Sequence, residues 1–315
     1  MGRMGSAQTL CEMGETPVPD GHDRQWELNR RNFQGRWCGA SQWFLRDQLG
    51  ALDLRRPSRV IADTCYAISF SDADTGTWDG AGLLFAPGGR RCLPLSRAGY
   101  NSGGQCWQFE GAGGQSSLAV DPAQSRFGHE INLFLQHPGL QHPGGRSRSM
   151  LVLLWGQQEP GGEGAGHGLP GWQLDAVGAV PFRCSLSGAV EPPRPQRPWQ
   201  DLLDEQRGWP GVLERLQPGA WPNHDPLPEP CDPFDPALFH QEPPQAGQQL
   251  VAGCVDGLVF AVPETLPAAG FSLQVGCRLA PQRFDLISIH FGADQRLECW
   301  ERRRFSAAAG STTAG

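Results

Sequence analysis

The feature that most constrains the fold of this chain is a repeated alternation of side chains with a period of two. Residues 271–279 alternate between apolar and small or polar side chains over nine positions, and residues 64–70 place bulky side chains on even positions and small ones on odd positions. This period is typical of a strand with one buried face, because successive side chains of a strand point to opposite sides. Similar runs recur at close spacing, separated by turn sequences and with almost no helical pattern. The sequence therefore predicts an all-β, antiparallel sandwich or barrel, and a barrel has the advantage of leaving no unpaired edge.

Proline content divides the chain into parts. Residues 191–244 carry 14 of the 28 prolines, and proline cannot donate to the ladder of a central strand. We therefore expect this stretch to be an irregular connection with one short helix at 199–206. The expected organisation is a disordered leader (1–23), a β-barrel (24–190), the proline-rich connection (191–244), an antiparallel β meander of a second, smaller barrel-like domain (245–305) and a disordered tail (306–315).

Charge and hydropathy exclude two classes of partner. The net charge is −7 and the sequence pI is about 5.6, so no excess of positive charge exists to displace counterions from a nucleic acid. The longest apolar run, at 150–155, is far shorter than the roughly 20 residues that span a bilayer. The start of the chain lacks a secretory pattern, which predicts a cytoplasmic location. All 26 basic residues are arginine, which excludes catalysis by a lysine amine.

The cysteines and histidines form no metal-binding or catalytic pattern. The ten cysteines stand singly with no CxxC motif, so we expect them to be reduced. His137 and His142 each precede Pro-Gly, and with His129 and His167 they are expected to lie singly in loops, without a metal. The enzyme signatures HExxH, GxSxG and GxxxxGK do not occur. Catalytic residues stay unassigned, and no cofactor is required.

A Gly-x-Trp motif, formed by Gly35 and Trp37, lies just before the first expected strand. It resembles the opening of lipocalin-type (calycin) barrels, in which the tryptophan plugs the closed end. A late arginine cluster contains Arg302 and Arg304 in the last expected strand. In calycins such an arginine stacks on that tryptophan through a cation–π contact. The resemblance implies a calycin/lipocalin-like barrel with these four residues as its structural motif.

A wider resemblance covers most of residues 24–305. Residues 26–44, 256–263 and 271–275 resemble a family of uncharacterised cyanobacterial and chloroplast proteins with a calycin-like barrel and a second β-rich domain. The phycobiliprotein lyases, which are calycins that bind linear tetrapyrroles, are more distantly similar. The resemblance implies a link to photosynthetic pigment handling, with an antenna protein as a partner.

Two expected strands carry the candidate ligand site. Three even-numbered side chains of the early strand 64–70 share one face, and three of the late strand 172–184 share another. A barrel can bring two such strands together around a planar apolar ligand, such as a tetrapyrrole. An arginine beside the late strand can pair with carboxylates of that ligand. The candidate ligand-binding residues are Tyr66, Ile68, Phe70, Trp172, Leu174, Phe182 and Arg183.

Three functions remain open on these observations. The first is binding of a small hydrophobic or tetrapyrrole-like ligand inside the barrel. The second is a bilin lyase that attaches a chromophore to a cysteine of a partner protein, where orientation would supply most of the catalysis. The third is a non-binding assembly or structural factor whose barrel is filled by its own side chains. The missing catalytic motifs favour the first.

Overall fold

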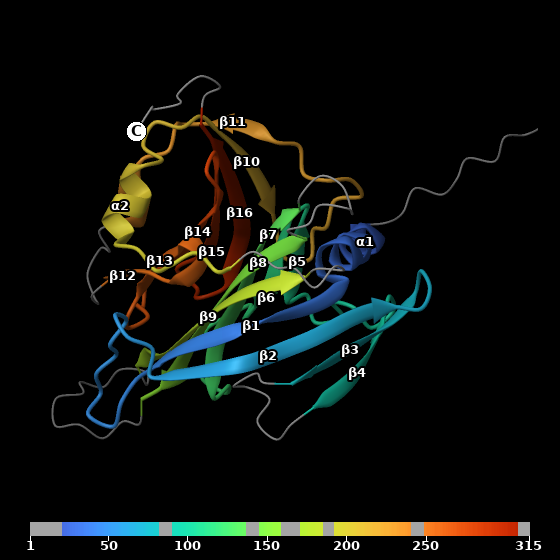
Figure 1. Cartoon of the computed structure of the whole chain (residues 1–315), viewed down its shortest axis with the longest axis horizontal. Coiled ribbons are helices and arrows are strands. Elements are labelled where there is room, and N and C mark those ends of the chain that lie inside the picture. The colour runs from blue at the N-terminus through green and yellow to red at the C-terminus, as the bar shows by residue number, and fades with distance from the viewer. Residues whose placement is uncertain are drawn as a thin grey trace, which may run out of the picture.

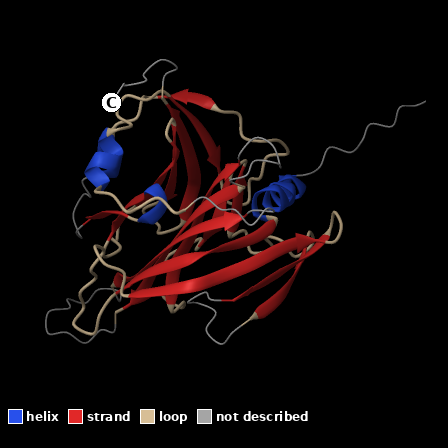
Figure 2. Cartoon of the chain, viewed as in Figure 1, coloured by secondary structure: helices blue, strands red, loops and turns tan. Residues whose placement is uncertain are grey.

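The computed structural model describes residues 21–81, 90–136, 145–158, 171–184, 192–240 and 249–307. Strands dominate these residues, and helices are few and short (Figures 1 and 2). Neighbouring strands pair antiparallel in both sheets. The antiparallel all-β class expected from the alternation is confirmed.

The strands before the proline-rich stretch form one large sheet. They are β1 (Gly35–Leu45), β2 (Arg59–Phe70), β3 (Thr75–Ala81), β4 (Arg91–Ser96), β5 (Cys106–Phe109), β6 (Ala112–Ser116), β7 (Arg126–Gln136), β8 (Arg146–Gln157) and β9 (Trp172–Cys184). Their order in space is β4-β3-β2-β1-β9-β8-β7-β6-β5. The sheet curls into a half-barrel, with β4 and β5 at its two edges (Figure 1).

The later strands form a second, smaller sheet. They are β10 (Gly211–Leu216), β11 (Glu229–Cys231), β12 (Gln249–Gly253), β13 (Leu258–Pro263), β14 (Phe271–Ala280), β15 (Arg283–Phe291) and β16 (Leu297–Ser306). Their order is β11-β10-β16-β15-β14-β13-β12, so β12 to β16 form the expected meander. Two 3-10 turns, η1 (Pro236–Phe239) and η2 (Val255–Gly257), join the strands.

Helix α1 (Gly21–Phe33) fastens one end of the half-barrel. Asp23 in its first turn and arginines in its last turn complement the helix dipole. The side chain of Gln25 donates to the carbonyl oxygen of Gln108 at 3.0 Å, and Asn32 donates to two more backbone carbonyls of the β5–β6 hairpin. These buried bonds fix the helix against the sheet.

The ends of the chain differ in part from the expectation. The helix begins at Gly21, so residues 21–23 are not part of a disordered leader. Ser306 is the last residue of β16, so it belongs to the sheet and not to the tail. Residues 1–20 and 308–315 lie outside the described residues.

The proline-rich stretch contributes strands as well as the expected helix, which is α2 (Trp199–Asp204). Strand β10 contains no proline, begins directly after Pro210 and pairs with β16 inside the sheet. Strand β11 lies at the edge of the sheet, where Pro230 interrupts no inner ladder. The expectation of an irregular connection is therefore wrong for these two segments, because the prolines flank one strand and occupy the edge in the other.

A shared hydrophobic core lies between the two sheets, where β14 lies against β7 and β8. Trp107 of the first sheet stacks on Trp300 of the second, with ring centroids 6.2 Å apart, and both indoles donate to the hydroxyl of Ser116. A second apolar cluster lies on the concave face of the first sheet. The middle strands of the first sheet, such as β8, are therefore buried on both faces, whereas the edge strand β4 is mostly exposed. The concave face carries the candidate site.

Candidate functional site

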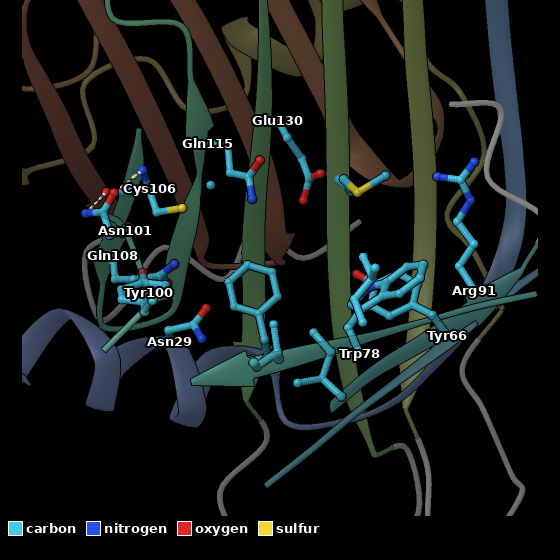
Figure 3. Close-up of a pocket in the computed structure, with 17 residues that line it drawn as sticks. Asn29, Tyr66, Trp78, Arg91, Tyr100, Asn101, Cys106, Gln108, Gln115 and Glu130 are labelled. Atoms are coloured by element: carbon cyan, nitrogen blue, oxygen red, sulfur yellow. Dashed lines mark hydrogen bonds between the residues drawn. The ribbon is translucent and has the colours of Figure 1, made fainter. Parts of the chain in front are cut away.

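A cavity of about 440 Å³ lies over the concave face of the first sheet, next to α1 (Figure 3). Ile68 of β2 is paired with Trp78 of β3, which is paired with Leu93 of β4. Because paired residues point to the same side of a sheet, these three side chains form one apolar row. Tyr66 and Met150 extend this wall along β2 and β8.

Gly80 allows two large rings of the wall to lie side by side. A Cβ atom at this position would be 2.4 Å from the Cβ of Tyr66 and 2.8 Å from the ring of Trp78. Without it, the two ring centroids lie 5.4 Å apart and the rings are tilted by only 30°. The glycine therefore permits a broad aromatic surface beside the cavity.

The opposite side of the cavity is polar. Asn29, Gln108 and Gln115 line it with amide side chains (Figure 3). Asn101 has a positive φ of 54°, and its side chain accepts from the amide nitrogen of Cys106 at 2.7 Å and donates to its carbonyl oxygen at 2.8 Å. Burial raises the pKa of Cys106 to about 11. This side thus presents neutral hydrogen-bonding groups at positions fixed by the backbone.

One carboxyl group, that of Glu130 on β7, faces the cavity (Figure 3). It accepts a hydrogen bond from Nδ2 of Asn132 at 3.0 Å, and Nη2 of Arg148 lies 3.5 Å away. Removal from bulk water raises the pKa of Glu130. Its neutral form can donate a hydrogen bond to a ligand, and its charged form has a cation beside it.

Arg148 of β8 lies beneath the cavity in a cage of aromatic rings. Its Nε donates to Oδ1 of Asn132 at 2.7 Å, whereas Nη1 has no hydrogen-bond partner among the described residues. Burial lowers the pKa of Arg148 well below its usual value. The guanidinium carbon lies 4.9–5.8 Å from five ring centroids, those of Phe33, Trp37, Tyr66, Phe134 and Phe182. These rings replace part of the hydration that burial removes.

The structure brings four of the seven predicted ligand residues to the concave face. Tyr66 and Ile68 line the cavity. Phe182 packs against Tyr66, with ring centroids 5.1 Å apart. Phe70 belongs to the same apolar cluster and meets the ring of Trp26 at 5.4 Å. The early strand therefore faces the cavity as its alternation indicated.

Trp172 and Leu174 lie on the opposite face, in the core between the sheets. The cause is a β-bulge: Ala176 pairs with Leu154, Leu174 pairs with Trp155, and Asp175 is left between them. One extra residue in a strand moves the side chains that precede it to the opposite face of the sheet. The expectation that Trp172 and Leu174 share a face with Phe182 is wrong for this reason.

Arg183 also points away from the cavity, toward η2, the turn between β12 and β13 of the second sheet. Its Nη2 donates to Oδ1 of Asp256 at 2.6 Å, and its Nη1 donates to Oδ2 at 3.0 Å. Ser149 and Arg194 donate to the same carboxylate. In the structure Arg183 thus joins the two sheets, and it does not reach the cavity.

The tryptophan of the Gly-x-Trp sequence contacts a different arginine from the one expected. Trp37 is fully buried, and its indole donates to the carbonyl oxygen of Phe33 at 2.8 Å. The guanidinium carbon of Arg146 lies 4.9 Å from its ring centroid, and Arg146 also donates to backbone carbonyls at the end of α1. Gly35, the first residue of β1, has a φ of 135°, and a Cβ atom there would lie 2.7 Å from the sulfur of Cys184.

Arg302 and Arg304, expected to stack on Trp37, lie in the second sheet. Arg302 pairs with Asp285 at 3.0 Å, and Arg304 approaches Glu214 at 3.3 Å. The expected pairing is corrected to Arg146, because β8 and not the last strand of the chain passes beside the tryptophan in this topology.

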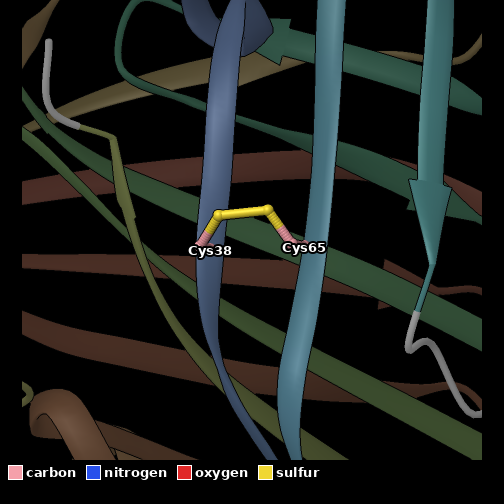
Figure 4. The surroundings of a disulfide bond; sticks show 2 residues. All are labelled: Cys38 and Cys65. Atoms are coloured by element: carbon pink, nitrogen blue, oxygen red, sulfur yellow. A yellow bond between two sulfur atoms is a disulfide. The ribbon is translucent and has the colours of Figure 1, made fainter. Parts of the chain in front are cut away.

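A disulfide joins Cys38 of β1 to Cys65 of β2, behind the cavity wall (Figure 4). The two residues are direct partners in the strand register, with Cα atoms 4.2 Å apart. Their neighbours Trp37 and Tyr66 point to the concave face, so the bond lies on the reverse side. The expectation of reduced cysteines is wrong for this pair, because the hairpin sets two sequence-distant thiols opposite each other.

Several residues of the site were not identified from the sequence: Glu130, Arg148, Met150, Trp78 and Leu93. A signal was present for two of them. Glu130 interrupts an apolar strand, and Arg148 alternates with small residues just before the apolar run at 150–155. Charged side chains inside such strands are seldom buried without a partner, so they mark a special environment.

The histidine at 129 is a core residue. Its ring lies 4.8 Å from the ring of Phe127 and 5.8 Å from that of Phe291, between the two sheets. Burial lowers the pKa of His129 to about 3. His137, His142 and His167 lie outside the described residues.

Comparisons with known proteins identify the fold but no activity. No family model matches the sequence, and no curated protein matches it. The structure is similar to that of a protein of unknown function from the DUF3598 family of the cyanobacterium Nostoc punctiforme, with a TM-score of 0.58 and 12% identity over 90% of this chain and 99% of that chain. The similarity to transferrin-binding protein B of Haemophilus parasuis has a TM-score of only 0.15 and does not indicate a shared fold.

The helices of the described residues are all too short or too polar to cross a membrane.

Proposed function

We propose that this protein binds a small, predominantly apolar ligand in the cavity on the concave face of the first sheet. The observation that carries the proposal is the row formed by Ile68, Trp78 and Leu93, which gives the cavity an apolar wall opposite polar groups. Its volume of about 440 Å³ is within the range of about 300–1,000 Å³ that small-molecule sites occupy.

The polar groups narrow the class of ligand. Glu130 is the carboxyl at the base, with the guanidinium of Arg148 behind it, and Arg91 lies at the rim. This arrangement suits a flat apolar molecule that has a hydrogen-bonding group at its inner end and an anionic group near the rim. A linear tetrapyrrole with propionate side chains is the specific ligand that we propose, and a role in pigment handling with an antenna partner rests on the sequence resemblance.

The experiment is a titration of tryptophan emission with a linear tetrapyrrole, a carotenoid and a fatty acid in turn. Binding should quench the emission saturably at one ligand per chain, and Trp78→Phe should reduce the amplitude because this ring lines the cavity. Trp172→Phe is the matched control, since its ring lies on the other face of the sheet. Absence of saturable quenching with all three classes would favour an assembly factor without a ligand.

A further inference from the structure

A cluster of polar side chains lies on the face of the second sheet that points away from the first. His290 of β15 and Cys299 of β16 are direct partners in the strand register. Glu301 lies two residues further along β16, so it shares their face. Trp300, between them, points into the core that the sheets share. The strand pairing therefore holds an imidazole, a thiol and a carboxylate together on a rigid surface.

The geometry points to a site for a divalent transition-metal ion of the zinc class, held by His290, Cys299 and Glu301. One ligand atom from each side chain lies within 4.8 Å of the other two. In a tetrahedral zinc site the ligand atoms are about 3.5 Å apart, so the side chains need to converge by about 1 Å. Side-chain rotation alone can supply this, because Cys299 and Glu301 are anchored on one strand.

His290 is oriented as a ligand by a residue of the neighbouring strand. Its Nδ1 lies 2.7 Å from the hydroxyl of Ser272 on β14. A proton on Nδ1 that is donated to this hydroxyl leaves the lone pair on Nε2, which faces the cluster. Nε2 lies 3.4 Å from Oε2 of Glu301 and is buried without hydrogen-bond geometry to any described residue. A metal ion between Nε2 and this carboxylate would replace their long contact by a bond to each.

The choice of metal follows from the donor atoms. An imidazole nitrogen and a thiolate favour zinc, cobalt or similar ions, whereas magnesium and calcium prefer oxygen ligands alone. An open depression lined by Gln217 and Glu298 lies over the cluster. It leaves room for a fourth ligand, either water or the carboxylate of Glu298.

Two arginines beside Glu301 repel a bound metal cation, so the negative charge of a thiolate is needed at this site. Arg215 donates to Oε1 of Glu301 at 2.5 Å, and Arg303 donates to Oε2 at 2.6 Å. They orient the carboxylate but also place positive charge near the metal. A thiolate on Cys299 offsets one of these charges. Loss of the sulfur should therefore weaken metal binding more than loss of a neutral ligand would.

The test is a titration of the metal-free, full-length protein with Co²⁺, followed by displacement with Zn²⁺. We expect one Co²⁺ per chain, with visible bands of a tetrahedral ion and an ultraviolet thiolate-to-cobalt band. Cys299→Ser should abolish the thiolate band, and His290→Gln should weaken Zn²⁺ binding at least tenfold. The matched controls are Cys92→Ser, which removes an exposed free thiol, and His224→Gln, which removes an exposed imidazole. Both should bind as the wild type does.

Circular dichroism shows whether each variant is folded. If one variant is unfolded, the other variant still tests the proposed metal site. The assignment is overturned if the wild-type protein shows no thiolate-to-cobalt band. It is also overturned if the band persists in folded Cys299→Ser, or if Zn²⁺ affinity is unchanged in folded His290→Gln. Ligand binding in the first sheet is measured separately, so either proposal can fail without the other.

Discussion

Nη2 of Arg148 lies 3.5 Å from Oε1 of Glu130, on adjacent strands at the base of the cavity. The arginine side chain is only 1% exposed and is surrounded by aromatic side chains, whereas the Glu130 side chain is 29% exposed and faces the cavity. A positive group behind and a titratable group in front give the base of the cavity a charge that depends on pH.

Glu130→Gln should flatten the dependence of stability on pH. Burial raises the folded-state pKa of Glu130 above its ordinary value of 4.5, so the folded protein holds a proton that the unfolded chain releases. The stability that this group contributes is fully present below pH 4.5 and is lost as the pH rises through the folded pKa. Urea unfolding at several pH values should show this decline in the wild type and a smaller one in the variant. An identical decline in both proteins would assign it to another group.

Trp37→Ala should lower the free energy of unfolding by about 3–5 kcal/mol, as expected for truncation of a buried aromatic side chain. The variant loses the contact with Arg146 and the hydrogen bond to Phe33 as well as its packing. Leu227→Ala is the control, because this side chain is 77% exposed and its loss should cost less than about 0.5 kcal/mol. Equal denaturation midpoints for the two variants would contradict the place given to Trp37.

Asp256→Asn should destabilise the protein by about 3–5 kcal/mol, because it leaves the buried guanidinium of Arg183 without its counter-ion. Burial opposes ionisation of Asp256, but Arg183 and Arg194 outweigh it and lower its pKa. Its contribution is therefore present at neutral pH and is lost as the pH falls through the folded pKa. Calorimetry at neutral and acidic pH should show the difference between wild type and variant shrinking in acid. Asp204→Asn, at an exposed ion pair, should have little effect at either pH.

The unfolded protein should contain eight titratable thiols before reduction and ten after it. This count follows from ten cysteines with Cys38 and Cys65 joined, and it treats Cys11, outside the described residues, as a thiol. Rapid alkylation in denaturant followed by mass spectrometry measures it. Ten thiols in freshly prepared, unreduced protein would contradict the bond between Cys38 and Cys65.

Regular strands could be predicted from the sequence because their alternation is local. The facing of Tyr66 and Ile68 followed from their own strand, which continues unbroken through the cavity wall. Trp172 and Leu174 could not be placed in this way. The bulge that turns them is visible only in the pairing of β9 with β8, where Asp175 has no opposite residue.

Contacts between segments that lie far apart in the chain could not be predicted either, because no local pattern of residues encodes them. Arg146 approaches Trp37 because β8, β9 and β1 are neighbours in the sheet, an order that no local pattern encodes. His290 and Cys299 look like isolated residues in the sequence, and only the register of their hairpin makes them partners. The prolines of 191–244 indicated irregular chain, although six residues between Pro210 and Gln217 pair as an inner strand.

The most direct test of the proposed function fills the cavity without changing the fold. Ile68→Trp places a larger side chain in the row beside Trp78, whereas Val60→Trp adds the same group near the start of the same strand, where Val60 is 55% exposed. Isothermal titration with the ligand class that quenches the wild type should show at least tenfold weaker binding to folded Ile68→Trp and unchanged binding to Val60→Trp. Wild-type affinity in folded Ile68→Trp would contradict the assignment of this cavity as the binding site.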